Sequence, residues 1–203
     1  MDNFTLTGVA KDLGVSTPSL YRLIRSRSDL VDLCLHHLAR QFPHKKPSVS
    51  EKEPDSPRWR ALLWGYVDDF WDLMQQHPGL GISIATHPGA HAHAQPYIHA
   101  LSQELIEAGF PGNPKQVDFV IDYIGDLVIT TDIFITSMRA HYDNGDRGID
   151  VARRRLSEQA QMTGQNTHIP ATESWVARGG LDAKVTYLLN SIEAGIPLPE
   201  MED

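Results

Sequence analysis

The chain has 203 residues, of which 41% are hydrophobic and 22% charged, and its formal net charge is −8. This length suffices for one or two domains with a real apolar core, and the composition is that of an ordinary soluble globular protein. The single cysteine, Cys34, excludes an internal disulfide framework and fits a reducing cytoplasm. No run approaches the roughly 18 apolar residues of a membrane span, and no signal peptide opens the chain. We therefore expect a cytoplasmic protein with no membrane partner.

The negative charge is unevenly distributed along the chain. Through Pro47 the sequence carries seven basic and four acidic residues, whereas the remaining 156 residues carry eleven basic and twenty-two acidic ones. The first segment therefore has a net charge of +3 and the rest a net charge of −11. Such asymmetry suggests that only the N-terminal end meets nucleic acid.

The segment from Thr5 to Leu38 has the pattern of a short helix, a tight turn, a second short helix and a longer third helix. The first helix runs to about Leu13, with Leu6, Val9, Ala10 and Leu13 at helical spacing. Gly14 ends it, because glycine readily takes the left-handed backbone conformation found after helices. Ser16 or Thr17 is expected to cap the next helix, whose first turn holds Pro18.

The second helix combines an inward apolar pair with an outward polar face. Leu20 and Ile24 face inward at a spacing of four, and the exposed positions are Thr17, Ser19, Arg22 and Leu23. Small hydroxyl groups and a cation are the residue types that read base edges or hold phosphates in a major groove. Ser28 is predicted to cap the third helix, whose N-terminus would offer free N–H groups to a phosphate. A plain three-helix cluster with merely solvated basic residues is the alternative.

The run VAKDLGVSTPSLYRLIRSRSDL resembles the DNA-binding segment of the tetracycline-repressor (TetR) family. The matching features are the LGV turn, the PSLY that opens the second helix, and a basic residue three positions before the leucine of the next helix. The resemblance extends over about 35 residues. It implies that Thr17, Pro18 and Ser19 approach the bases, that Tyr21 and Arg27 contact phosphates, and that Thr7 and Arg22 lie at the groove edge.

The start of the chain departs from the family pattern. Family members usually begin with a full amphipathic helix that packs across the helix-turn-helix, whereas only Met1, Asp2 and Asn3 precede Phe4 here. A late start codon, a truncation and a true lack of this helix all remain open. In each case we expect a less stable DNA-binding head with reduced affinity.

The resemblance implies an all-α fold with an N-terminal helix-turn-helix domain followed by a helical bundle. We place the DNA-binding domain at residues 1–43, a linker at 44–56, and an effector-binding and dimerisation domain at 57–203. The stretch from Pro43 to Pro57 is rich in proline, serine and charge and has no apolar period, which is typical of a linker. Lys45 and Lys46 in it either touch a phosphate or are simply solvated.

A strong helix is predicted from Ser56, as its N-cap, to about His77. Two of its sides are apolar: Trp59, Leu63, Tyr66, Phe70 and Leu73 mark one, and Trp64, Val67, Trp71 and Met74 the other. Such a helix is central to a bundle or lines an internal cavity. Core packing is the more frequent explanation, but the resemblance implies that this region borders a ligand pocket.

Four histidines follow within thirteen residues: His87, His91, His93 and His99. The first three lie between a short helix ending at Thr86 and a longer helix expected to start near Gln95, and His99 lies within the longer helix. Their spacing matches no recognised zinc pattern, which favours a solvated loop or an adventitious metal site. The sharper alternative is that His87 or His91 orients a bound effector, because imidazole both donates and accepts hydrogen bonds.

The longest regular segment is predicted from Lys115 to about Tyr142. Asp122 and Asp126 lie one helical turn apart in it, as a catalytic carboxylate pair would, but no nucleophile or metal-ligand set accompanies them. A solvated or dimer-facing acidic edge is therefore favoured. The resemblance implies that this helix supplies half of a homodimer interface. A final helix, from about Leu181 to Ala194, would join it in a four-helix bundle made by two subunits.

Another helix is expected between these two, capped by Asp150. Its three consecutive arginines, Arg153, Arg154 and Arg155, point about 100° apart on a helix and cannot form one patch.

Together these observations predict a sequence-specific, ligand-responsive transcriptional regulator, most simply a repressor. It would bind an inverted-repeat operator as a homodimer and be released by a small-molecule effector. We expect no enzymatic activity, no cofactor and no metal. The effector should be moderately sized and mostly apolar, and the residues expected near it are Trp64, Phe70, Trp71, Met74, Ile84, His87, Tyr97 and Tyr123. The alternatives are a helical ligand-binding or scaffold dimer that no longer binds DNA, and a metal-dependent enzyme using the histidines with Asp122 or Asp126.

Overall fold

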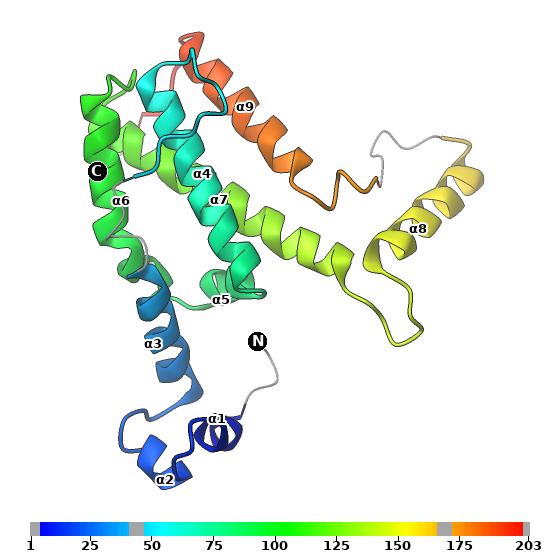
Figure 1. Cartoon of the computed structure of the whole chain (residues 1–203). Helices are drawn as coiled ribbons and strands as arrows, with labels where there is room; N and C mark the ends of the chain where they lie inside the picture. Colours follow the sequence, from blue (N-terminus) through cyan, green and yellow to red (C-terminus); the bar gives the residue numbers. More distant parts are fainter. Residues whose placement is uncertain (1–4, 41–46, 166–171, 201–203) are drawn as a thin grey trace.

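A computed structural model describes residues 5–40, 47–165 and 172–200, and within them the fold is all-α (Figure 1). The helices are α1 (Leu6–Asp12), α2 (Thr17–Leu20), α3 (Arg27–Ala39), α4 (Arg58–Gln76), α5 (Leu80–Thr86), α6 (Ala90–Glu107), α7 (Pro114–Arg139), α8 (Gly148–Thr163) and α9 (Gly179–Glu193). In that part of the chain the extended pairing is limited to one isolated bridge between His141 and Arg147. The all-α prediction is confirmed.

The first two helices form the predicted helix-turn-helix. Thr5 Oγ1 accepts a hydrogen bond from the Gly8 N–H at 3.0 Å, and α1 ends before Gly14, whose φ is +67°. Ser16 caps α2, because its Oγ accepts from the Ser19 N–H, and Pro18 sits in the first turn as expected. A small core of Ala10, Leu20 and Ile24 closes this head, with Leu6, Val9 and Leu30 packed against it.

The third helix starts two residues earlier than the sequence indicated. Ser26, not Ser28, is its N-cap: Ser26 Oγ accepts from the Asp29 N–H at 3.2 Å and donates to Asp29 Oδ1 at 2.8 Å. Two serines were available as caps, and Asp29 decides between them because its carboxylate also accepts from the Arg25 N–H at 2.8 Å. This reciprocal arrangement is favourable at a helix N-terminus.

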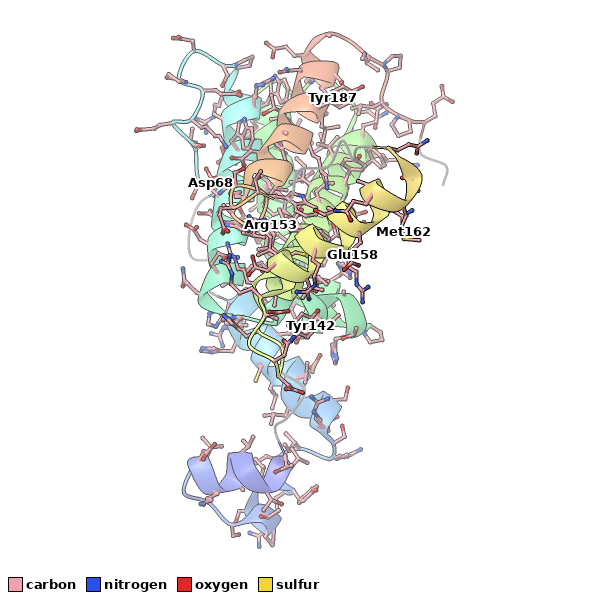
Figure 2. The ribbon with its side chains drawn as sticks, turned by 90° about the vertical axis from the view of Figure 1, so that its right-hand side faces the viewer. Asp68, Tyr142, Arg153, Glu158, Met162 and Tyr187 are labelled. Carbon is pink, nitrogen blue, oxygen red and sulfur yellow. The ribbon has the colours of Figure 1, made fainter. Side chains whose placement is uncertain are left out.

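The body is a bundle in which α4 and α7 are central. Their apolar residues form one continuous core together with α6 and α9, and Leu35 and Leu38 of α3 belong to it. Two perpendicular views show α1 and α2 at one end of the molecule, joined to the body through α3 (Figures 1 and 2). Helix α3 is therefore the physical link between the two cores.

Helices α4 and α6 begin at different residues from those predicted. Ser56 does not cap α4, because its Oγ donates to the Glu53 carbonyl at 2.7 Å, and Pro57 precedes the first helical residue. Helix α6 begins at Ala90 and carries Pro96 in its interior, where a start near Gln95 was expected. Pro96 and Ala92 are both exposed, so the carbonyl that lacks a helical partner faces solvent, which lowers the cost of an internal proline.

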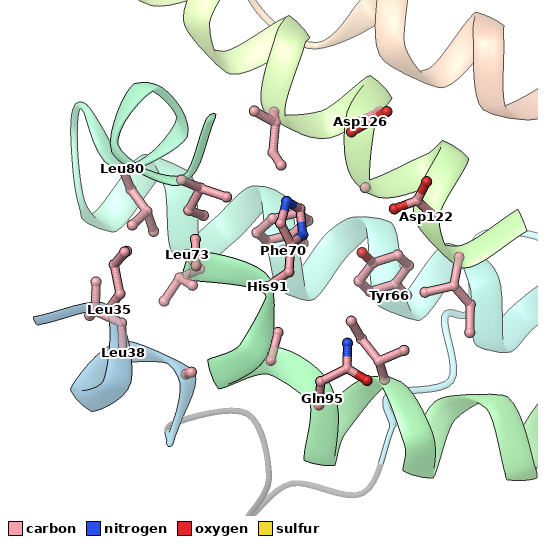
Figure 3. A pocket seen from close by; sticks show the side chains of 18 of the residues that line it. Leu35, Leu38, Tyr66, Phe70, Leu73, Leu80, His91, Gln95, Asp122 and Asp126 are labelled. Carbon is pink, nitrogen blue, oxygen red and sulfur yellow. The ribbon is translucent and has the colours of Figure 1, made fainter. Parts of the chain in front are cut away.

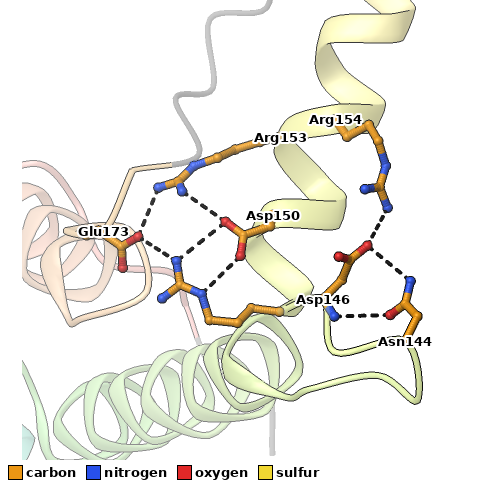
Figure 4. Close-up of polar contacts among 7 residues, drawn as sticks. Asn144, Asp146, Asp150, Arg153, Arg154 and Glu173 are labelled. Carbon is orange, nitrogen blue, oxygen red and sulfur yellow. Dashed lines mark hydrogen bonds and ion pairs between the residues drawn. The ribbon is translucent and has the colours of Figure 1, made fainter.

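Helix α8 extends away from the rest of the bundle (Figure 1). It begins at Gly148, with Asp150 in its first turn and not as its cap. Figure 4 shows how its base is held: Arg153 contacts Asp150 and Glu173, whereas Arg154 contacts Asp146. Arg155 pairs with Glu158 on the same helix. The three adjacent arginines thus serve separate partners, as their angular spacing predicted.

Part of the predicted linker packs closely on α4. The Ser50 N–H donates to the Ala61 carbonyl at 3.0 Å, and Ser50 Oγ donates to Asp68 at 3.0 Å. A Cβ atom on Gly65 would lie 1.9 Å from the Ser48 carbonyl oxygen, so only glycine permits this approach. Lys45 and Lys46 lie outside the described residues, and the domain boundaries at 43 and 56 stay predictions.

Candidate DNA-binding surface and effector cavity

The residues expected to meet DNA are displayed together on the head. Thr7, Pro18, Tyr21, Arg22 and Arg27 are exposed, whereas Thr17 and Ser19 are half-buried. Helix α2 is one turn long and continues as a turn through residue 23, with the Leu23 N–H donating to the Leu20 carbonyl at 2.9 Å. The Tyr21 side chain on this turn is 52% exposed.

The N-terminus of α3 is partly occupied by the chain's own carboxylate. Hydrogen bonds from the Arg25 N–H and the Ser26 hydroxyl hold the pKa of Asp29 below its usual value. An ionised carboxylate there uses the positive end of the helix dipole that was expected to bind a DNA phosphate. Phosphate contacts on this head therefore depend more on its cationic and hydroxyl side chains.

The body contains a cavity of about 410 Å³ enclosed by α3, α4, α5, α6 and α7 (Figure 3). This lies within the range of roughly 300–1,000 Å³ that is usual for small-molecule sites. Its wall is formed by Leu35, Leu38, Ala39, Tyr66, Phe70, Leu73, Leu80, Ile84, Ala90, His91, Ala94, Gln95, Ile98, His99, Asp118, Ile121, Asp122, Gly125, Asp126 and Ile129. Every helix from the link α3 to the long α7 thus touches the same space.

The structure brings together only some of the residues expected near an effector. Phe70 and Ile84 line the cavity, and Tyr97 is buried behind the wall, 6.1 Å from the ring of Tyr66. The other expected residues do not line it. Lys52 Nζ covers the Trp64 ring at 3.9 Å, and Arg178 lies 6.0 Å from the Trp71 ring.

The remaining three expected residues also lie elsewhere. Met74 is buried in the main core, Tyr123 is exposed beside Phe119, and the His87 ring is bonded to Asp32. The sequence could not tell which apolar side of α4 faces the cavity, because both sides are equally apolar.

Of one polar part of the wall, the sequence analysis had suggested only His91 as an effector contact. His91, Gln95 and His99 recur every fourth residue on α6, and Asp118, Asp122 and Asp126 do so on α7. Residues four apart lie on one face of a helix, so the spacing itself was a usable signal. The sequence had placed the aspartates on a solvated or dimer-facing edge, and all three are exposed.

A histidine clamp ties α3 to the cavity helices. Asp32 Oδ1 accepts hydrogen bonds from His93 Nε2 at 2.8 Å and from His87 Nε2 at 3.1 Å. These two bonds hold the pKa of the Asp32 carboxyl below its usual value. His36 of α3 also packs edge-on against His93, with ring centroids 5.3 Å apart.

Among the described residues, no group of three or more His, Cys, Asp or Glu side chains is arranged to hold a metal ion. No helix in the same part of the chain has the length and apolar character needed to span a membrane.

The structure thus joins a helix-turn-helix, through the single helix α3, to a body that holds a ligand-sized cavity. The chain is 28% identical over 163 residues to the class A tetracycline repressor protein from transposon 1721 of Escherichia coli, an alignment covering 77% of this chain and 68% of that protein. No family model matches the chain, and no solved structure matches it. This similarity and the geometry of the head agree with the resemblance to the tetracycline-repressor family found in the sequence.

Proposed function

We propose that the protein is a homodimeric repressor that binds an inverted-repeat operator and is released when a small molecule fills the cavity. The observation that carries the proposal is the double role of α3. Its N-terminal half packs on the head through Leu30, and its C-terminal half supplies Leu35 and Leu38 to the cavity wall. A molecule in the cavity therefore touches the helix that holds the recognition helix.

On the DNA side, the contact expected of each residue follows from its position on the head. Thr17, Pro18 and Ser19 approach base edges, Tyr21 and Arg27 contact phosphates, and Thr7 and Arg22 lie at the groove edge. The exposure of the Tyr21 and Arg22 side chains supports these assignments. The net charge of +3 through Pro47 favours contact with DNA at this end, and the acidic body disfavours it elsewhere.

The release mechanism requires two arrangements of α3 relative to the body. An effector shifts this balance only by its differential affinity for the two arrangements. Phe70 and Ile84 are the expected effector residues that line the cavity, and Leu35 and Leu38 of α3 line it as well. An occupant that fits best when Leu35 and Leu38 move would lower the affinity for DNA.

The homodimer is proposed through α7 and α9. Tyr187 of α9 is 75% exposed and stands at the surface in Figure 2, and Tyr123 of α7 is also exposed. Half-buried Leu127 and Leu188 lie on the same two helices. Large apolar side chains on adjacent helix faces fit a four-helix interface with a second copy. Two-fold symmetry would place two recognition helices about one DNA turn apart. Such a regulator would act in the cytoplasm.

The proposal is tested by selection from a library of randomised DNA duplexes, followed by sequencing. The expected result is enrichment of one inverted repeat whose half-sites are separated by about one helical turn. Enrichment of an asymmetric single site would contradict the dimer. No enrichment, with a chain that remains folded and dimeric, would favour a ligand-binding dimer that no longer binds DNA.

A further inference from the structure

The cavity has an apolar floor and a polar mouth. Its buried wall residues, such as Leu73, Leu80 and Ile121, are apolar, whereas the exposed wall residues on α6 and α7 are mostly polar. A ligand in this cavity therefore has two environments, an apolar one inside and a polar one where it meets solvent.

The charge at the mouth has one sign. Asp118, Asp122 and Asp126 line it, and no lysine or arginine does so among the described residues. Within the described chain, no hydrogen bond or ion pair joins any of these three carboxylates to another side chain. Three carboxylates on successive turns repel one another and create a negative potential at the cavity opening.

An independent observation inside the cavity points to a ligand. Tyr66 is only 6% exposed, and its hydroxyl has no hydrogen-bond partner among the described residues. Figure 3 shows this hydroxyl directed toward the α7 wall, where Asp122 and Asp126 project. A Cβ atom on Gly125 would lie 2.9 Å from the hydroxyl oxygen, so the absence of a side chain there leaves room for it. The hydroxyl oxygen is not among the fully buried atoms that lack a partner, so it opens onto the cavity, where a ligand can hydrogen-bond to it.

The aromatic surface of the wall complements this charge. The rings of Tyr66 and Phe70 are stacked, with centroids 5.8 Å apart and an interplanar angle of 12°. Both belong to the wall, and the negative faces of such rings attract cations and flat aromatic groups. Burial and the nearby charges of Asp122 and Asp126 raise the pKa of Tyr66, so its phenol stays neutral and can accept or donate a hydrogen bond.

We infer that the effector is an organic cation with an aromatic or branched apolar body. Its positive group lies at the mouth beside Asp122 and Asp126, and its body lies on the floor against Phe70 and the leucines. The inference rests on the proposed function, because it names the ligand class of the same cavity. Anionic molecules are repelled at the mouth, and neutral ones gain nothing from the carboxylates.

The test compares two dyes of nearly the same shape. Thioflavin T is a benzothiazolium cation, and its uncharged analogue lacks only the methyl group on the ring nitrogen. Equilibrium dialysis of the full chain, without DNA, measures the affinity for each dye. The wild-type protein should bind thioflavin T about tenfold more tightly than the neutral analogue, as expected for opposite charges a few ångströms apart near a surface.

Substitutions distinguish cation binding at the cavity mouth from a general effect of the protein's net charge. Asp122→Asn/Asp126→Asn should weaken thioflavin T binding about tenfold and leave the neutral dye within about twofold. The matched control, Asp72→Asn/Asp143→Asn, changes the net charge equally at exposed positions outside the wall and should leave both affinities unchanged. Equal weakening by both double variants would overturn the inference.

The remaining outcomes distinguish failure of this inference from failure of the proposed function. Failure to bind thioflavin T, or equal affinity for the two dyes, overturns the inference of a cationic effector. Such a failure together with sequence-selective DNA binding leaves the regulator in place. Cation binding by a chain that selects no DNA sequence supports the cavity inference and removes the proposed function.

Discussion

Asp32 of α3 and His93 of α6 are joined by a hydrogen bond of 2.8 Å between the carboxylate Oδ1 and the ring Nε2. The same oxygen accepts from His87 Nε2 at 3.1 Å, so one side chain fastens the link helix to two points beside the cavity. Because the pKa of Asp32 is lowered in the folded protein, its stabilising effect is present above the ordinary aspartate pKa. That effect is lost only as the pH falls through the lowered value.

Asp32→Ala should loosen α3 without unfolding the body. The variant removes both clamp bonds, while Leu35 and Leu38 keep their apolar packing. We expect faster amide hydrogen exchange in α3, by about fivefold or more, with α7 unchanged. Asp72→Ala, at an exposed position of α4, is the control. Unaltered exchange in α3 would mean that the clamp does not hold this helix.

The two proposed phosphate contacts should respond differently to salt. Arg27→Ala should weaken binding to all duplexes and lower the slope of log affinity against log salt by about 1. Tyr21→Phe removes a neutral hydroxyl, so it should weaken binding about threefold to tenfold with the slope unchanged. Anisotropy titrations at several salt concentrations measure both quantities. Lys184→Ala, at an exposed position of α9, should change neither, and a changed slope for Tyr21→Phe would refute its assigned role.

Asp132→Asn should stabilise the protein at neutral pH. Asp132 is 3% exposed and burial raises its pKa, an effect that the Gly81 N–H and Arg139 only partly offset. An acid whose folded pKa is raised destabilises the fold at every pH above that pKa. This loss of stability disappears as the pH falls below the pKa that the carboxyl has in the unfolded chain. Relief of about 1 kcal/mol would raise the Tm by about 2–4 °C.

Thermal unfolding of Asp132→Asn between pH 4 and 8 checks both the direction of the stability change and the pH range in which it appears. The gain in Tm should shrink as the pH approaches the ordinary aspartate pKa of about 3.9. A gain that is constant over this range would exclude ionisation as its cause, and a loss at neutral pH would contradict the sign.

Gly65→Ala should destabilise the body. Its Cβ would lie 1.9 Å from the Ser48 carbonyl oxygen, so the 47–57 segment must move away from α4. Overpacking of this kind costs about 1–3 kcal/mol, measurable by urea unfolding. Gly180→Ala is the matched control, since nothing lies within 4 Å of the added Cβ. Equal stability of Gly65→Ala and the wild type would show that the segment is not fixed on α4.

Local signals made the helix-turn-helix predictable. The Gly14 turn, the Ser16 cap and the inward pair Leu20 and Ile24 each depend on residues within one or two helical turns. Where two local candidates competed, the sequence was ambiguous. Ser26 and Ser28 are both possible caps, and the choice depends on the hydrogen bonds that Asp29 makes in three dimensions.

The cavity was less predictable because its wall comes from five helices. The pattern of α4 shows two apolar sides, but only the packing partners decide that Phe70 faces the cavity while Trp64 and Trp71 do not. Because the helix was expected to start near Gln95, the sequence did not place His91, Gln95 and His99 on one face of α6, which begins at Ala90. The aspartates of α7 were noticed, yet their relation to a cavity needed the other four helices.

The most direct test of the central claim is fluorescence anisotropy of the full chain with the duplex recovered by selection and with a scrambled duplex, at several salt concentrations. The account predicts binding to the selected duplex at least about 10³-fold tighter than to the scrambled one, weakening steeply as salt rises. Equal affinity for the two duplexes, or affinity that does not change with salt, would contradict the account.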